Sequence, residues 1–184
     1  VVWGLEYPAP ASRWQSGTAM HLVDRARNVL PLLVHEPGLS QGAIVLVGYS
    51  LGGLVIKQML RVAQDSSGHD EKVGSFVRRV RKVAFIATPH AGSDHASWMQ
   101  HLSLLMLPRE PTLGLVRNHA GLRDLNVWYR DFSVQHEITN LVLWETQPYH
   151  LTRRIFGREF AIPLGVIVKP DSSDPGLPQP AQII

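Results

Sequence analysis

The sequence contains no cysteine among its 184 residues. This absence excludes disulfide bridges, thiolate metal ligands and a cysteine nucleophile. Long apolar runs are also missing: no stretch approaches the roughly 20 residues that cross a bilayer, and the amino terminus lacks the charged-then-apolar order of a signal peptide. We therefore expect no transmembrane segment and a cytoplasmic location, with peripheral contact to a membrane surface as an alternative.

Neither sign of charge is in large excess, because 18 Lys and Arg residues and 15 Asp and Glu residues give a net charge of +3. The one dense basic cluster, residues 78–82, has no interleaved aromatic residue and is typical of a solvated helix end rather than a nucleic-acid surface. Neither Gly-x-Gly-x-x-Gly nor Gly-x4-Gly-Lys-Ser/Thr occurs. His90, Asp94 and His95 lack the spacing of a known metal motif. We expect no nucleic-acid partner and no cofactor or metal.

The remaining composition indicates one α/β domain. With 45% hydrophobic residues, the chain can build a single core. Apolar runs predict strands at residues 1–5, 43–47, 82–87, 138–144 and 163–168. Helical patterns alternate with these runs, which implies a mainly parallel sheet flanked by helices.

Helices are expected over residues 22–33 and 54–63, where apolar side chains recur at helical spacing. Pro31 should kink or shorten the first of them. Residues 97–132 lack strand patterns and are expected to hold two more helices. We interpret them either as core-facing helices or as a helical cap whose apolar side chains line an acyl pocket.

The segment Gly48-Tyr49-Ser50-Leu51-Gly52 matches the Gly-x-Ser-x-Gly nucleophile elbow, with a strand-like run before it and a helical pattern after it. Glycines at this spacing remove side chains that would collide where the strand turns into the helix, so Ser50 can be held strained with its hydroxyl exposed. Ser50 is thus the candidate nucleophile, and the Leu51 N–H is the candidate oxyanion donor. The alternative is a tight turn with an idle serine.

A serine nucleophile requires a histidine and a carboxylate, which follow it in the order acid, histidine in α/β-hydrolases. Glu145 and Asp174 each lie in a loop after a predicted strand, and we favour Glu145 with Asp174 as the alternative acid. Either could instead be an ordinary loop or turn charge. No histidine follows Asp174, and His150 is too close to Glu145 to approach from a separate loop. His90 is interpreted as a structural hydrogen-bonding residue, so no histidine of the sequence is assigned to the triad.

Four segments together resemble the α/β-hydrolase serine esterase/lipase group related to GPI inositol-deacylases. They are residues 48–58, 86–93, 145–146 and 172–176. The resemblance spans nearly the whole chain, and its most specific part is the elbow combined with Thr-Pro-His-x-Gly-Ser. It implies an α/β-hydrolase fold that cleaves carboxylic esters, including lipids, or transfers their acyl groups.

The resemblance also implies parts that the sequence does not contain. The catalytic histidine is expected in an Asp-His loop soon after the Asp-Pro-Gly segment, beyond Ile184, and a His-Gly segment is expected ahead of the first strand. Tyr49 stands where the group usually has histidine. We therefore expect residues 1–184 to be one α/β-hydrolase domain lacking its first strands and its last strand with the histidine loop, within a longer multidomain protein. The competing hypothesis is a catalytically inactive hydrolase-fold interaction or regulatory domain.

Overall fold

A parallel sheet forms the centre of the domain in the computed structural model. The structure describes residues 1–5, 22–88, 90, 119–144, 149–155, 158–165 and 182–183. Within that part, the sheet has the order β1-β2-β3-β6, and each neighbouring pair is parallel. The strands are β1 (Ile44–Tyr49), β2 (Val80–Ile86), β3 (Thr139–Trp144) and β6 (Gln182–Ile183). The expected α/β fold with a mainly parallel sheet is confirmed.

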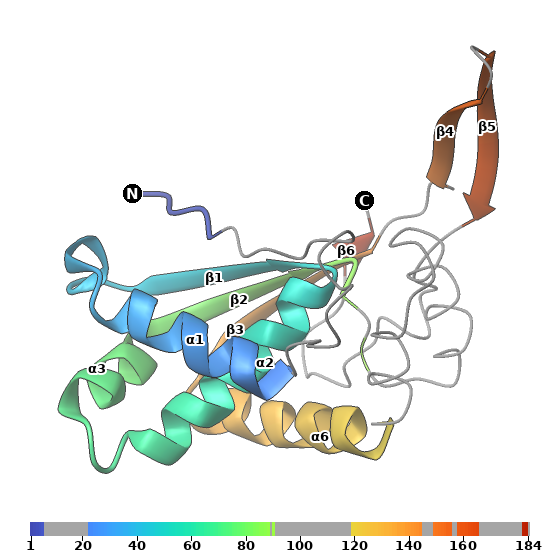
Figure 1. The fold of residues 1–184 in the computed structure, drawn as a ribbon. Coiled ribbons are helices and arrows are strands. Elements are labelled where there is room, and N and C mark those ends of the chain that lie inside the picture. The colour runs from blue at the N-terminus through green and yellow to red at the C-terminus, as the bar shows by residue number, and fades with distance from the viewer. Residues whose placement is uncertain are drawn as a thin grey trace.

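The described helices pack beside this sheet, as Figure 1 shows. They are α1 (Leu22–Val34), α2 (Leu51–Ser66), α3 (Glu71–Arg79) and α6 (His119–Gln135), with a short 3₁₀ turn, η2 (Pro37–Leu39), before β1. Helix α2 follows β1 after a single residue, so the elbow joins a strand directly to a helix. In the described ranges, no helix is both long and apolar enough to cross a bilayer.

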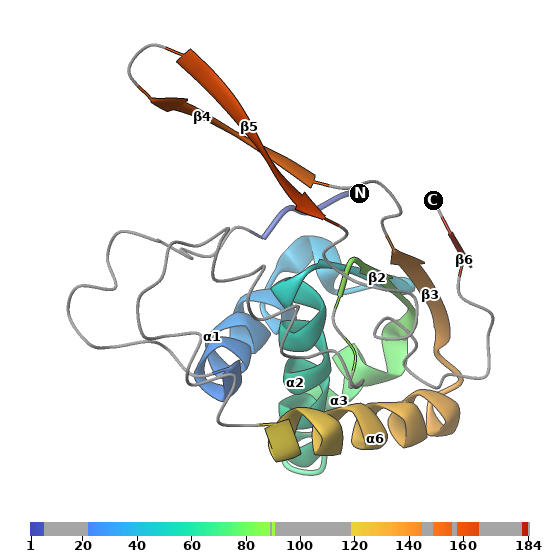
Figure 2. The same cartoon turned by 90° about the vertical axis from the view of Figure 1, so that its right-hand side faces the viewer.

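Two strands stand apart from the main sheet. Strands β4 (Tyr149–Ile155) and β5 (Arg158–Gly165) form an antiparallel pair, and Figures 1 and 2 both show this pair projecting away from the sheet and helices. The predicted strand over residues 163–168 is wrong in its start, because β5 begins at Arg158, whereas residues 166–168 lie outside the described residues. Strand β4 was not predicted. The two-residue connection explains the arrangement, because such a short link joins antiparallel neighbours.

Two local predictions are wrong. Residues 1–5 form no strand, and Val1 and Val2 are fully exposed, because an apolar run gains strand structure only when a neighbouring strand pairs with it. Pro31 does not shorten α1, which continues to Val34, and the Pro31 carbonyl accepts a hydrogen bond from the His35 N–H at 3.0 Å. The packing of α1 into the core outweighs the helix-breaking tendency of this proline.

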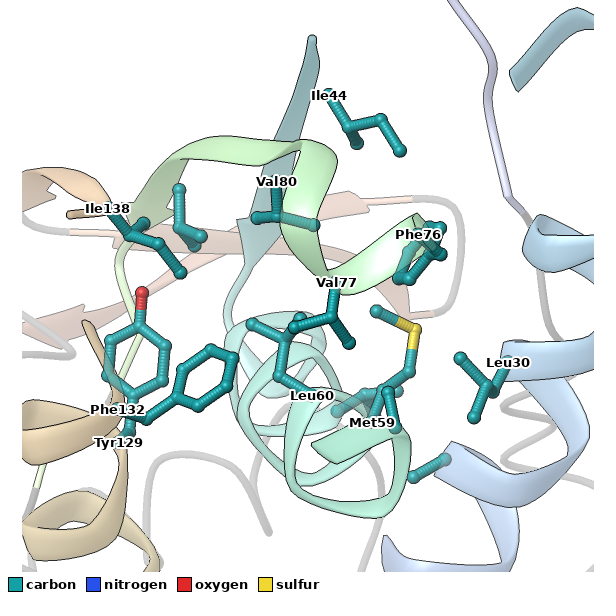
Figure 3. Close-up of a cluster of buried hydrophobic side chains, with 14 of the residues drawn as sticks. Leu30, Ile44, Met59, Leu60, Phe76, Val77, Val80, Tyr129, Phe132 and Ile138 are labelled. Carbon is teal, nitrogen blue, oxygen red and sulfur yellow. The ribbon is translucent and has the colours of Figure 1, made fainter. Parts of the chain in front are cut away.

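The hydrophobic core lies where the helices meet the sheet (Figure 3). Its members from the helices include Leu30 of α1, Met59 and Leu60 of α2, Phe76 and Val77 of α3, and Tyr129 and Phe132 of α6. The described end of the expected 97–132 helical region therefore packs into the main core as part of α6. Residues 97–118 lie outside the described residues, so the cap stays a prediction.

Candidate active site

Ser50 occupies the turn between β1 and α2 with φ 50° and ψ −122°. A positive φ is uncommon for a residue other than glycine, costs about 1–3 kcal/mol and persists only where the surroundings enforce it. The Ser50 N–H donates to the Ile86 carbonyl of β2 at 2.8 Å, and the Ser50 carbonyl accepts from the Gly53 N–H at 3.1 Å. The turn at Ser50 thus has the strained backbone that the motif predicts.

Two glycines allow this turn to close. A Cβ on Gly48 would lie 2.6 Å from the Cα of Gly53, and a Cβ on Gly53 would lie 2.2 Å from Oγ1 of Thr88. Both distances are far too short for a side chain, so the strand, the helix and the segment after β2 meet only because these positions are glycine. The Thr88 hydroxyl is buried and donates to the Gly48 carbonyl at 3.4 Å. Gly53 lies outside the five-residue motif, and its sequence signal was the doubled glycine at 52–53.

Leu51 is the first residue of α2. The first N–H groups of a helix have no partner within the helix and carry its positive end, so they favour negative charge. The Ser50 N–H is already bonded to β2. The Leu51 N–H lies at this helix start, and its assignment as the oxyanion donor stays a prediction.

The strand ends bring distant parts of the sequence to one edge of the sheet. Tyr49 of β1 aligns with Ile86 of β2, which aligns with Leu143 of β3. Since neighbouring strands lie about 4.8 Å apart, the chain leaves β3 roughly 10 Å from where it leaves β1. Glu145, directly after β3, and Asp174 both lie outside the described residues, so their assignments as acids stay predictions.

A buried polar cluster joins α2, α6 and the segment after β2. The Lys57 side chain from α2 is only 1% exposed, and its Nζ lies 2.7 Å from Nδ1 of His90 and donates to Oδ1 of Asn126 at 2.5 Å. The same Nζ lies 5.1 Å and 5.3 Å from the ring centroids of Phe85 and Tyr129, so two aromatic faces also border the amine. Helix α2, helix α6 and the segment after β2 meet at this one nitrogen.

Burial sets the protonation of this cluster. It lowers the pKa of Lys57 to about 7, and burial, followed by the nearby Lys57 charge, holds the pKa of His90 well below its usual value. His90 is therefore neutral, and its Nδ1 shares a hydrogen bond with the Lys57 amine. In the part of the chain that the structure describes, Nε2 has no hydrogen-bond partner. His90 is thus a buried hydrogen-bonding residue, as its turn predicted.

Sequence reasoning missed Lys57. A lysine in an amphipathic helix is normally exposed, but Lys57 lies three residues after Leu54 and three before Leu60, on the buried face of α2. That position on the apolar stripe was the available signal. His150 lies on β4, and its side chain is outside the described residues.

A parallel sheet flanked by helices, with a strained serine at a strand-to-helix turn, defines an α/β-hydrolase-like domain. Residues 25–110 match the protein family described as "Putative serine esterase (DUF676)". The matched range contains Ser50 and His90 but neither Glu145 nor Asp174. The fold is therefore α/β-hydrolase-like, and the part of the chain over residues 25–110 is similar to this serine esterase family.

The chain is also similar to several curated proteins. The chain is 26% identical over 155 residues to Protein SERAC1 of Danio rerio, and this alignment covers 82% of this chain and 23% of that protein. It is 25% identical over 175 residues to Protein SERAC1 of Bos taurus, covering 94% and 25%, and 24% identical over 149 residues to that of Homo sapiens, covering 80% and 22%. The chain thus spans about a quarter of the length of these curated relatives. No solved structure gives a significant match.

Proposed function

We propose that this domain hydrolyses carboxylic esters through an acyl-enzyme on Ser50. The Ser50 oxygen attacks the ester carbonyl carbon, and its proton passes through a histidine to the departing alcohol. Water then attacks the acyl-enzyme and releases the acid. The observation that carries this proposal is the backbone of Ser50, because φ 50° and ψ −122° at a strand-to-helix turn is a strained arrangement of the kind that presents a nucleophile.

Leu51 and one carboxylate complete the roles that we assign within the chain. The Leu51 N–H is proposed to stabilise the oxyanion, since it belongs to the first residue of α2. Glu145 is our first choice for the acid, because β1 and β3 end at the same sheet edge, and Asp174 is the alternative. His90 is an unsuitable base, because it is buried and its Nδ1 is engaged by Lys57. The proposal therefore takes its histidine from outside the described residues.

The substrate class follows from the family and the resemblance. We propose an ester or lipid small molecule, since the group that the sequence resembles includes both esterases and lipases. In the described part of the chain, the elbow offers a serine hydroxyl at the start of α2. This arrangement suits an ester carbonyl.

Fluorophosphonate labelling of the full-length protein, as its gene encodes it, tests the proposal. We expect one label, located at Ser50 by mass spectrometry, together with hydrolysis of p-nitrophenyl esters. Ser50→Ala should abolish both. Ser66→Ala, at the opposite end of α2, should leave both unchanged.

A folded full-length protein that neither labels nor hydrolyses esters would contradict the proposal. That result would favour the competing hypothesis, a hydrolase-fold domain with an interaction or regulatory role. Labelling that persists in Ser50→Ala would contradict the assignment of the nucleophile, even if the protein is an esterase.

A further inference from the structure

We propose that Lys57 and His90 are positioning residues for Ser50: their hydrogen bond holds the segment that follows β2 against the nucleophile elbow. This proposal rests on the proposed function of Ser50. Neither side chain is assigned contact with the substrate. Their effect passes through Thr88 and Ile86, which touch the elbow directly.

The last residue of β2 and the segment after it support the elbow at three points. The Ile86 carbonyl accepts from the Ser50 N–H at 2.8 Å. The Thr88 hydroxyl donates to the Gly48 carbonyl at 3.4 Å, and the Thr88 side chain occupies the space where a Cβ of Gly53 would lie. A shift of this segment would therefore move hydrogen-bond and packing partners on both sides of Ser50.

The segment is itself strained, so it requires support. Ala87, between Ile86 and Thr88, has φ 47°, close to the φ of 50° at Ser50. Each such non-glycine conformation costs about 1–3 kcal/mol and persists only when its surroundings over-determine it. On one side the Ala87 N–H is held by the Leu143 carbonyl of β3 at 2.8 Å. His90 is the described anchor on the other side.

The Lys57 amine attaches that anchor to the core. Its Nζ lies 2.7 Å from Nδ1 of His90 and donates at 2.5 Å to Asn126 of α6. Phe85, the buried residue at the end of β2, packs its ring edge-on to His90 with centroids 5.0 Å apart. His90 thus contacts Lys57 of α2 and Phe85 of β2, and Asn126 of α6 binds the same Lys57 amine.

The chemistry of the cluster favours this role over simple packing. Burying an amine among aromatic rings costs free energy that an apolar side chain of similar volume would not. A hydrogen bond, unlike apolar contact, fixes direction as well as proximity. A directional link is what a strained serine requires, because a misplacement of about 1 Å at a reacting atom costs about 100-fold in rate.

Two near-isosteric substitutions at His90 separate the hydrogen bond from the packing. His90→Asn keeps a hydrogen-bonding amide close to the position of Nδ1, whereas His90→Leu keeps a similar volume without one. In the full-length protein, we expect His90→Leu to slow fluorophosphonate labelling of Ser50 about 10- to 100-fold. We expect His90→Asn to remain within a few fold of wild type. In ester hydrolysis, His90→Leu should lower kcat and leave KM little changed.

Substitutions on α2 provide a matched comparison. Lys57→Met removes the donor and should resemble His90→Leu. Arg61→Met breaks the 2.6 Å ion pair of Arg61 with Asp124, which joins the same two helices near the surface, and should label like wild type. If His90→Leu or Lys57→Met does not fold, His90→Gln takes its place. The glutamine amide lies near the position of Nε2 rather than Nδ1, so this variant should also lose the hydrogen bond to Lys57.

Amide hydrogen exchange over residues 48–54 gives a readout that does not depend on catalysis. We expect faster exchange in His90→Leu and Lys57→Met than in wild type, and wild-type exchange in His90→Asn and Arg61→Met. Folded His90→Leu with wild-type labelling and exchange would overturn the positioning role, while leaving Ser50 as the nucleophile. Wild-type protein that never labels would overturn the proposed function, and the exchange data would still decide whether the cluster positions the elbow.

Discussion

Replacing Lys57 with methionine should change how the free energy of unfolding depends on pH. Burial lowers the pKa of Lys57 from 10.5 to about 7, which corresponds to about 5 kcal/mol of differential free energy. Between these values the unfolded chain carries a proton that the folded domain does not. Unfolding therefore takes up a proton, and the stability contributed by neutral Lys57 is present above pH 10.5 and lost as the pH falls toward 7.

The expected magnitude is large enough to measure. Wild-type stability should rise by up to about 1.4 kcal/mol per pH unit in this window through Lys57 alone. Methionine cannot titrate, so the stability of Lys57→Met relative to wild type should fall by about 2 kcal/mol between pH 7.5 and 9.5. Burial also raises the pKa of Tyr129, but both proteins contain this tyrosine, and its effect cancels in the difference.

Urea unfolding followed by tryptophan fluorescence at pH 7.5, 8.5 and 9.5 measures the difference. Loss of the bonds to His90 and Asn126 adds an offset that does not vary with pH, because His90 is neutral throughout. The pH dependence of the stability difference between Lys57→Met and wild type therefore reports the titration of Lys57. Lys82→Met, at an exposed lysine of β2, serves as the control and should run parallel to wild type. Parallel curves for Lys57→Met would refute the buried, neutral amine.

Two further predictions concern the triad acid and the glycine contact. In the full-length protein, either Glu145→Gln or Asp174→Asn should lower kcat by orders of magnitude, because the carboxylate orients the imidazole; small, equal effects would exclude both. Gly53→Ala should destabilise the domain by about 1–3 kcal/mol and slow labelling, since its Cβ would lie 2.2 Å from Thr88. Urea unfolding measures this, with Gly68→Ala as control because its Cβ meets nothing within 4 Å. Wild-type stability for Gly53→Ala would contradict the close contact.

Local patterns predicted the part of the site that local chemistry controls. The elbow at Ser50 and its helix follow from neighbouring residues, because glycine spacing and apolar periodicity act within one turn of chain. Residues 1–5 show the limit of this reasoning. Their composition suits a strand, but strand formation depends on a partner elsewhere in the chain, and they remain unpaired.

The antiparallel pair of β4 and β5 shows the same limit of prediction from local sequence. Its composition is mixed, and its pairing of β4 with β5 arises from the short connection between them rather than from a marked apolar alternation. Residues 97–132 were open to two interpretations from sequence, core helix or cap. The described α6 packs Tyr129 and Phe132 into the core, which periodicity alone could not distinguish from an apolar lining.

By itself, the sequence indicated the fold class, a resemblance to serine esterases and a candidate nucleophile, because these depend on short motifs and on the order of strands and helices. Only the tertiary structure decided that Lys57 is buried and bonded to His90, 33 residues away. The physical reason is that the pKa and the partners of a side chain depend on the burial and the neighbours that folding brings to it. A lysine in a helical pattern reveals neither its burial nor its partners, whereas the spacing of the glycines around Ser50 predicts the steric constraint directly.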